Sequence, residues 1–154
     1  MRKVVELKLV FDPSKCTGCR ACEVACSYKH YGEAGYAKSY IKHVFDPATG
    51  TFQAIYCLHC EEPLCMAACL SEAIWKDEAG IVRINQVKCI GCKTCNYACP
   101  LSVPAFNEEL RVSVKCDLCD GDPECVKFCS SGALRAYPRE IALELRSKIS
   151  GVRP

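Results

Sequence analysis

Short apolar stretches separated by turn-forming residues predict a series of small β-strands. Ile74–Lys76 and residues 81–84 are two such stretches, and the segment 77–80 between them is suited to a hairpin turn. Residues 4–11 and 133–137 are two further predicted strands, and they can pair with each other although they lie far apart in the chain. The pattern therefore predicts short strands that pair both locally and over a long distance.

The end of the chain follows a different pattern. Within residues 138–154, Ile141, Leu145 and Ile149 have the spacing of one face of a helix. We expect a helical tail there, outside a main domain of residues 1–137. No run of about 18 apolar residues is present that would span a membrane.

Cysteine is the anomaly in the composition. The 154 residues include 16 cysteines but only five phenylalanines and one tryptophan, so the core needs disulfides or metal to hold it together. The opening Met-Arg-Lys-Val-Val-Glu has neither the apolar core of a secretory signal nor a twin-arginine motif. We therefore expect a cytoplasmic location, where disulfides are rare, and metal binding as the role of the cysteines.

The charge gives little basis for binding nucleic acid. The formal net charge is +2, and no run of Lys and Arg is longer than two residues. We expect no nucleic-acid partner.

The sixteen cysteines fall into four groups of four, and none is left over. Groups one and three have the spacing C-x2-C-x2-C-x3-C, group two has C-x2-C-x4-C-x3-C, and group four has C-x2-C-x5-C-x3-C. In chain order the groups are Cys16, Cys19, Cys22, Cys26; Cys57, Cys60, Cys65, Cys69; Cys89, Cys92, Cys95, Cys99; and Cys116, Cys119, Cys125, Cys129.

Runs of this kind suit [4Fe–4S] clusters. Three thiolates from a tight loop bind three iron corners of one cubane, and the fourth cysteine, after three intervening residues, points away from it. Gly18 and Gly91, each directly before the second cysteine of its group, allow the backbone to approach closely. Structural zinc is the main alternative, because C-x2-C alone also binds zinc, but zinc ribbons do not need four-cysteine runs that end in x3-C.

The groups also indicate an internal duplication in the order A-B-A′-B′. Groups two and four share a proline two residues before the third cysteine, Pro63 and Pro123. Residues 57–104 alone resemble a bacterial two-cluster ferredoxin, which leaves residues 4–56 and 105–137 to form an outer unit. The resemblance implies an α+β fold of two nested ferredoxin-like units, with short hairpin strands and short helices around the clusters.

Longer runs resemble a known family. YCLHCEEPLCMAAC, KCIGCKTCNYACPLSVP and KCDLCDGDPECVKFC are similar to the four-cluster iron–sulfur subunits of molybdenum and tungsten oxidoreductases, including those of dimethyl sulfoxide reductase and formate dehydrogenase. The resemblance covers about residues 4–137. The opening run CTGCRACEVACSYKH resembles the small subunit that accompanies tungsten aldehyde oxidoreductases.

The family's ligand pattern implies that the groups interleave, so that each fourth cysteine binds a cluster of another group. The implied sets are Cys16, Cys19, Cys22 with Cys129; Cys116, Cys119, Cys125 with Cys26; Cys57, Cys60, Cys65 with Cys99; and Cys89, Cys92, Cys95 with Cys69. Because every cysteine of the pattern is present, the expected cofactors are four [4Fe–4S] clusters. Ser27, Leu70 and Ser130 replace the proline that usually follows three of the groups, which removes no ligand.

A row of clusters is suited to passing single electrons. We expect an electron-transfer subunit without a catalytic site of its own, because the cysteines are used as ligands and no nucleophile–base pair or phosphate loop is present. The resemblance implies a large catalytic oxidoreductase subunit of the molybdenum or tungsten type as partner, and a flavin or ferredoxin protein as a second redox partner. The alternatives are a freestanding polyferredoxin that serves several enzymes and a structural zinc protein that acts as an interaction module.

Five other side chains carry expectations. His59, inside group two, is expected either to donate a hydrogen bond to a cluster or to pack beside it. Lys93, inside group three, is expected to be solvated, with compensation of the cluster charge as the alternative. His30 and His43 are expected at the surface, and Trp75 is expected in the core of its hairpin.

Overall fold

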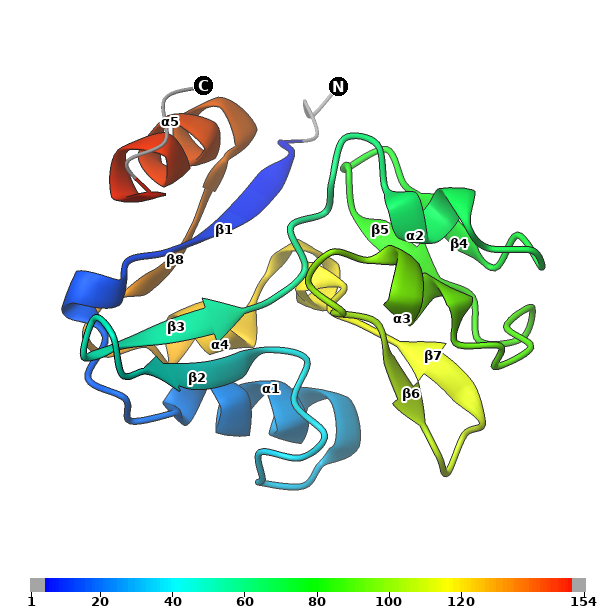
Figure 1. Ribbon diagram of the computed structural model, residues 1–154, viewed down its shortest axis with the longest axis horizontal. Helices are drawn as coiled ribbons and strands as arrows, with labels where there is room; N and C mark the ends of the chain where they lie inside the picture. Colours follow the sequence, from blue (N-terminus) through cyan, green and yellow to red (C-terminus); the bar gives the residue numbers. More distant parts are fainter. Residues whose placement is uncertain (1–4, 151–154) are drawn as a thin grey trace.

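The computed structural model describes residues 5–150, and its strands form four antiparallel sheets of two strands each (Figure 1). The pairs are β1 (Leu7–Phe11) with β8 (Leu134–Pro138), β2 (Lys42–Asp46) with β3 (Thr51–Ile55), β4 (Ile74–Lys76) with β5 (Val82–Ile84), and β6 (Ala105–Asn107) with β7 (Val112–Val114). Both predicted pairings are confirmed, and so are the predicted strands, although residues 5, 6, 81 and 133 lie just outside the observed strands and residue 4 lies outside the described part of the chain.

Most of the helices are short, and the two longer ones lie near the N-terminal and C-terminal ends of the chain. The helical elements are η1 (Pro13–Lys15), α1 (Ala21–Tyr31), α2 (Leu64–Ala67), α3 (Thr94–Ala98), η2 (Leu118–Gly121), α4 (Glu124–Lys127) and α5 (Arg139–Ser150). None of the helices within residues 5–150 has the length and apolar character needed to cross a membrane.

The elements repeat along the chain in the order expected from the cysteine spacing. The first repeat is β1, α1, the β2–β3 hairpin, α2 and β4; the second is β5, α3, the β6–β7 hairpin, α4 and β8. The first strand of each repeat pairs with the last strand of the other. The structure is thus an α+β fold with short hairpin strands and short helices, arranged as a duplicated ferredoxin-like motif.

Two sets of elements lie in different parts of the molecule. Helix α2 packs on α3 beside the β4–β5 sheet, and these green elements lie together on the right of Figure 1. Helix α1 packs on α4, on the side of the molecule that also holds β1 and β8. Segments far apart in the sequence are therefore neighbours in space.

The apolar core is small and partly made of cysteine. Leu9 of β1 and Leu134 of β8 are fully buried in the larger cluster. Beside the β4–β5 sheet, the buried apolar cluster consists of Ile74, Val82 and Cys95. Because few apolar side chains are buried, the core alone stabilises the fold only weakly. The cysteine sites therefore contribute to the stability of the fold.

The β4–β5 hairpin corrects one expectation. Ile74 is buried, whereas Trp75 is 47% exposed and does not belong to the hairpin core. Neighbouring residues of a strand point to opposite faces of the sheet, so only one of the two can face the core.

The predicted helical tail is α5, although residues 151–154 of the predicted range lie outside the described residues. The helix packs on β1 and β8. Its buried residue is Ala142, and Arg146 donates two hydrogen bonds to the Leu9 carbonyl. Ile141 and Ile149, on the predicted apolar face, are exposed.

Candidate metal centres

One cavity brings together cysteines from two different groups. Its lining includes Cys57, Cys60 and Cys65 of group two and Cys99, the last cysteine of group three. Apolar side chains and Lys115 form the rest of the wall. Four convergent sulfurs in an apolar cavity provide the donor set that an iron–sulfur cluster requires.

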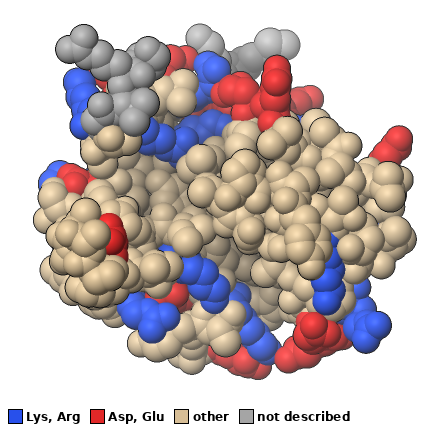
Figure 2. All heavy atoms as spheres, in the orientation of Figure 1, with Lys and Arg blue, Asp and Glu red and all other residues tan. Residues whose placement is uncertain are grey.

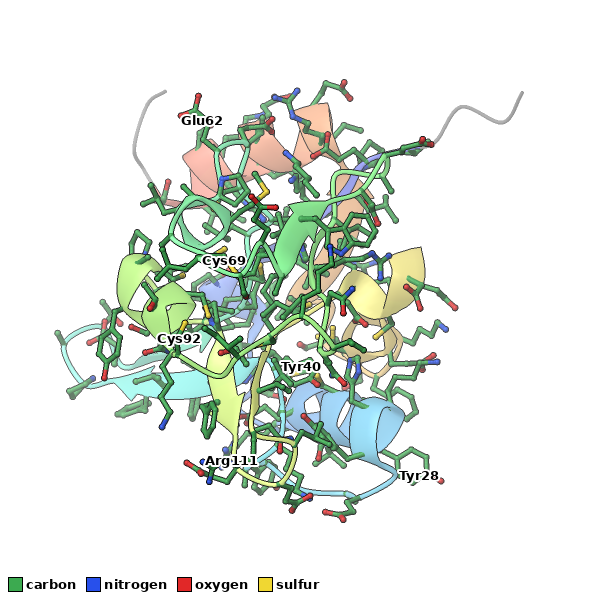
Figure 3. All side chains as sticks on the ribbon, turned by 90° about the vertical axis from the view of Figure 1, so that its right-hand side faces the viewer. Tyr28, Tyr40, Glu62, Cys69, Cys92 and Arg111 are labelled. Atoms are coloured by element: carbon green, nitrogen blue, oxygen red, sulfur yellow. The ribbon has the colours of Figure 1, made fainter. Side chains whose placement is uncertain are left out.

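A second cavity has the complementary composition. It is lined by Cys69, the last cysteine of group two, together with Cys89, Cys92 and Cys95 of group three. Figure 3 labels Cys69, which follows α2, and Cys92, which precedes α3, and shows them on neighbouring segments. Each of these two cavities therefore combines the first three cysteines of one group with the last cysteine of the other.

Groups one and four meet between α1 and α4. Burial raises the pKa of Cys22 to about 12, and the nearby Cys129 adds to this increase. Burial also raises the pKa of Cys125, with further contributions from Cys26 and Cys119. Cysteines of the two groups share one buried cluster, which contains Cys22, Cys26 and Cys125, with Cys16, Cys116 and Cys129 packed against it.

Raised thiol pKa values have a consequence for metal binding. Burial raises the pKa of Cys65 to about 11 and that of Cys116 well above its ordinary value. A metal ligand must be a thiolate, so binding has to displace these protons. Cationic iron favours the thiolate, which fits buried cysteines that are otherwise protonated.

Backbone amides point at several sulfurs, and the pattern repeats between groups two and four. The Ala73 N–H donates to Cys69 and the Leu134 N–H donates to Cys129, each with an N–S distance of 3.3 Å. Hydroxyls of Ser71 and Ser131 lie 3.7 Å from the same two sulfurs. Although burial opposes the effect, these contacts lower the pKa of Cys69 and Cys129. Hydrogen bonds to sulfur are one way in which a protein sets cluster potentials.

The loops of groups one and three share a left-handed turn. Gly18 and Gly91 have φ values of +71° and +69°, and the residues two positions later, Arg20 and Lys93, have φ values of 58° and 63°. A Cβ atom at Gly91 would lie 2.5 Å from the Arg111 carbonyl oxygen. The glycine is therefore needed both for its conformation and for the close approach of two backbones.

Replacing Gly91 with alanine is expected to destabilise the loaded protein more than the same change at Gly32. Gly32 has a φ of +68° but no atom within 4 Å of the added Cβ, so it reports conformational strain alone, about 1 to 2 kcal/mol. G91A adds a backbone clash, and its anaerobic Tm should lie about 5 °C below that of G32A. Equal Tm values for the two variants would contradict the close approach.

Two histidines expected at the surface are not there. The His43 side chain, from β2, is 3% exposed and lies between the ring of Phe11 and helix α1, with both ring nitrogens 3.8 Å from the sulfur of Cys22. His30 packs on Tyr40, and its Nε2 lies 3.9 Å from the sulfur of Cys119. Both side chains are covered by segments that are distant in the chain, which local sequence does not reveal.

His59 is buried and carries a donor without a partner. Its Nδ1 accepts a hydrogen bond from the Val82 N–H at 3.0 Å, so the proton of the neutral ring is on Nε2. Among the described residues, Nε2 has no hydrogen-bond partner. Burial lowers the pKa of His59 to about 2, and Lys115 and Lys8 add to the decrease. The structure thus supports a neutral histidine packed in the interior. Its buried Nε2–H donor is placed as expected for a group beside an acceptor such as cluster sulfide.

The lysine singled out from the sequence is not the buried one. Lys93 is at the surface, with its Nζ 4.1 Å from the ring centre of Phe106 and 4.0 Å from Glu108. Lys115 and Lys8 are buried instead. Sequence offered no signal for Lys115, because lysine also precedes the first cysteine of groups one and three.

Two families of iron–sulfur domain match the chain. The 4Fe-4S dicluster domain matches residues 48–139, and a 4Fe-4S binding domain matches residues 8–31. Together these matches contain all four cysteine groups.

Individual relatives are matched over most of their length. The protein is 36% identical to a subunit of the anaerobic dimethyl sulfoxide reductase of Escherichia coli, over 89% of its own length and 74% of that subunit. It is 40% identical to the polyferredoxin-like subunit of an aliphatic sulfonate oxidoreductase of Pyrococcus furiosus, over 79% of its own length and 70% of that subunit.

A solved structure shares the fold. A protein of the active-site complex BamBC of benzoyl coenzyme A reductase is 30% identical, with a TM-score of 0.50, and the match covers 97% of this chain and 93% of that one. The convergent cysteines, the duplicated fold and these matches agree with one another. The chain therefore belongs to the 4Fe-4S dicluster domain family of ferredoxin-like proteins, and its cofactors are four [4Fe–4S] clusters.

Proposed function

We propose that this chain is the electron-transfer subunit of an oxidoreductase complex and relays single electrons between a catalytic subunit and a second redox partner. The observation that carries the proposal is the pair of cavities that each combine three cysteines of one group with the last cysteine of the other, for groups two and three. When bound, [4Fe–4S] clusters accept and donate one electron at a time. The chain contributes their spacing, burial and hydrogen bonds.

The proposed ligand sets are those of the interleaved pattern. The two cavities support Cys57, Cys60, Cys65 with Cys99, and Cys89, Cys92, Cys95 with Cys69. The mutual effects of buried thiols between α1 and α4 support Cys16, Cys19, Cys22 with Cys129, and Cys116, Cys119, Cys125 with Cys26. On this assignment residues 57–104 form an inner unit, and 4–56 with 105–137 form an outer unit.

The two proposed units contact each other. Lys115, the residue before Cys116 of the proposed outer unit, donates a hydrogen bond at 3.4 Å to the sulfur of Cys57 of the proposed inner unit. Cys22 and Cys125, of the two proposed outer sets, lie in one buried cluster. These contacts support a relay that runs from the inner sets to the outer ones.

We propose a molybdenum- or tungsten-type catalytic subunit as the main partner, because relatives are named as subunits of dimethyl sulfoxide reductase and of an aliphatic sulfonate oxidoreductase. A flavin or ferredoxin protein is the proposed second partner. Lys and Arg mix with Asp and Glu at the edges of the face in Figure 2, which supports a protein partner over nucleic acid. We propose a cytoplasmic location, because the interleaved pattern uses all sixteen cysteines as cluster ligands and leaves none for a disulfide.

Anaerobic purification of the chain from its native host tests this function. We expect about sixteen irons and as many sulfides per chain, and a large oxidoreductase subunit that co-purifies. Dithionite should bleach the visible absorption, and the catalytic subunit with its substrate should exchange electrons with the loaded chain. Fewer than about twelve irons after full reconstitution would contradict four clusters. A loaded monomer that reduces many unrelated acceptors would identify a freestanding polyferredoxin, and zinc in place of iron would identify a structural module.

A further inference from the structure

Lys115 lies directly after β7 and before Cys116, and it is only 6% exposed. Its Nζ contacts the Val82 carbonyl, the Cys116 carbonyl at 2.9 Å and the sulfur of Cys57 at 3.4 Å. An ammonium group has three N–H donors, so two serve carbonyls and the third serves the sulfur. The side chain is held in place by contacts to its own neighbour and to two distant segments.

The charge of Lys115 is not balanced by a carboxylate. None of the ion pairs within residues 5–150 includes Lys115. Carbonyl oxygens satisfy hydrogen bonds but carry no net charge, and a buried unpaired ammonium is costly. A cluster with four thiolates carries a net charge of about −2 and supplies the missing counter-charge.

The position of Lys115 singles out one proposed ligand set. Lys115 lines the cavity that contains Cys57, Cys60, Cys65 and Cys99. Burial raises the pKa of Cys65, and the Lys115 ammonium opposes this increase, so its charge acts on a second sulfur of the same set. Cys116, the residue after Lys115, belongs to the neighbouring set.

We propose that Lys115 raises the reduction potential of the cluster held by Cys57, Cys60, Cys65 and Cys99. This cluster lies where the two proposed units meet, so its potential affects how easily an electron passes between them. One electron from the redox partner takes the core from 2+ to 1+, and no covalent bond forms or breaks. The added negative charge is stabilised by the ammonium and by its hydrogen bond to Cys57. Lys115 acts on the potential through a ligand and is a positioning residue.

Redox titration of the loaded full-length chain, followed by electron paramagnetic resonance, tests this role. In K115M, which keeps the length but removes the charge, the reduction equilibrium of one cluster should become about tenfold less favourable, a shift of about 59 mV to lower potential. The cluster is identified because its potential also moves in C57S. The potentials of the other three clusters should change less. Among these three, the cluster of the set that includes Cys116 should show the largest shift.

Two variants separate charge from packing. K115R keeps a positive donor and should stay within about threefold of the native equilibrium. Lys8 is a matched control, because it is 3% exposed and donates to the His59 carbonyl, but its charge is paired with Glu6 at 2.8 Å. Within residues 5–150 it makes no hydrogen bond to a cysteine sulfur. K8M should therefore not shift the reduction potential of this one cluster selectively.

A measurement on the native protein covers the case in which K115M does not assemble. With lysine labelled with ¹⁵N only at the side-chain nitrogen, one reduced cluster should show a hyperfine coupling to ¹⁵N, and the coupling should be absent in K115R. No such coupling in the native protein would overturn the proposal.

Other results would also overturn it. These are unchanged potentials in K115M with four clusters present, an equal shift of all four clusters, or the same shift in K8M. The inference rests on the proposed function, but the two fail differently. A chain that holds its irons and exchanges electrons, yet has potentials that do not depend on Lys115, refutes the inference alone; a chain without the irons refutes the function.

Discussion

Replacing Cys26 with alanine is expected to abolish the same midpoint potential that is abolished by replacing Cys119, although the two residues are far apart in the sequence. Cys26 is buried in α1, its sulfur accepts a hydrogen bond from the Tyr40 N–H at 3.3 Å, and it adds to the raised pKa of Cys119, which burial dominates. With a ligand missing, the cluster is lost or keeps three irons, so about one to four irons leave each chain. Iron analysis and a redox titration followed by electron paramagnetic resonance give both readouts.

Cys19 provides the matched control for this prediction. It lies in the same group as Cys26 but belongs to a different proposed set, so C19A should abolish a different midpoint potential. If C26A and C19A affect one and the same cluster, each group binds its own cluster and the interleaved assignment is wrong. The milder variant C26S, which retains an oxygen ligand, should shift the potential that C26A removes.

Removing the iron is expected to unfold the chain rather than leave an empty scaffold. The buried apolar clusters are small, and cysteines such as Cys22, Cys125 and Cys95 are part of them. Without iron, raised pKa values keep these thiols protonated, and nothing joins the loops that the ligands connect. A chelator under anaerobic, reducing conditions should abolish the cooperative thermal transition and the near-ultraviolet circular dichroism completely.

The reverse treatment is the control for this experiment. Addition of iron and sulfide to the apoprotein should restore both signals together with the visible absorption of the clusters. An apoprotein that retains a cooperative transition would show that the polypeptide core is sufficient without iron, in conflict with its small size.

Local spacing carried most of what could be predicted from the sequence. Three ligands of a cluster lie within a few residues, so their spacing encodes the shape of one loop, and Gly18 and Gly91 mark where that loop turns. The β4–β5 hairpin has a local turn for the same reason. The β1–β8 pairing could be inferred only because the duplicated order left these two strands without other partners.

Burial was the weak point of the sequence-based expectations. Trp75 and Ile74 are neighbours in a strand, and alternation does not tell which of the two faces inward. His43 is buried by contacts between a hairpin and a helix that are distant in the chain. On α5, Ala142 rather than the larger Ile141 faces the β1–β8 sheet, since a small side chain allows the helix to pack closely.

The sixteen cysteines by themselves determined the type and number of the cofactors and the duplicated order of the elements, because these depend on short-range spacing. The resemblance to a known family implied which cysteines share a site, whereas only the tertiary structure brings them into one cavity and decided which charges surround them. Cys99 reaches the cavity of group two by packing of α2 on α3, and Lys115 rather than Lys93 is buried against a sulfur. Burial and electrostatic contact depend on segments brought together from distant parts of the chain, and no local pattern of residues encodes that proximity.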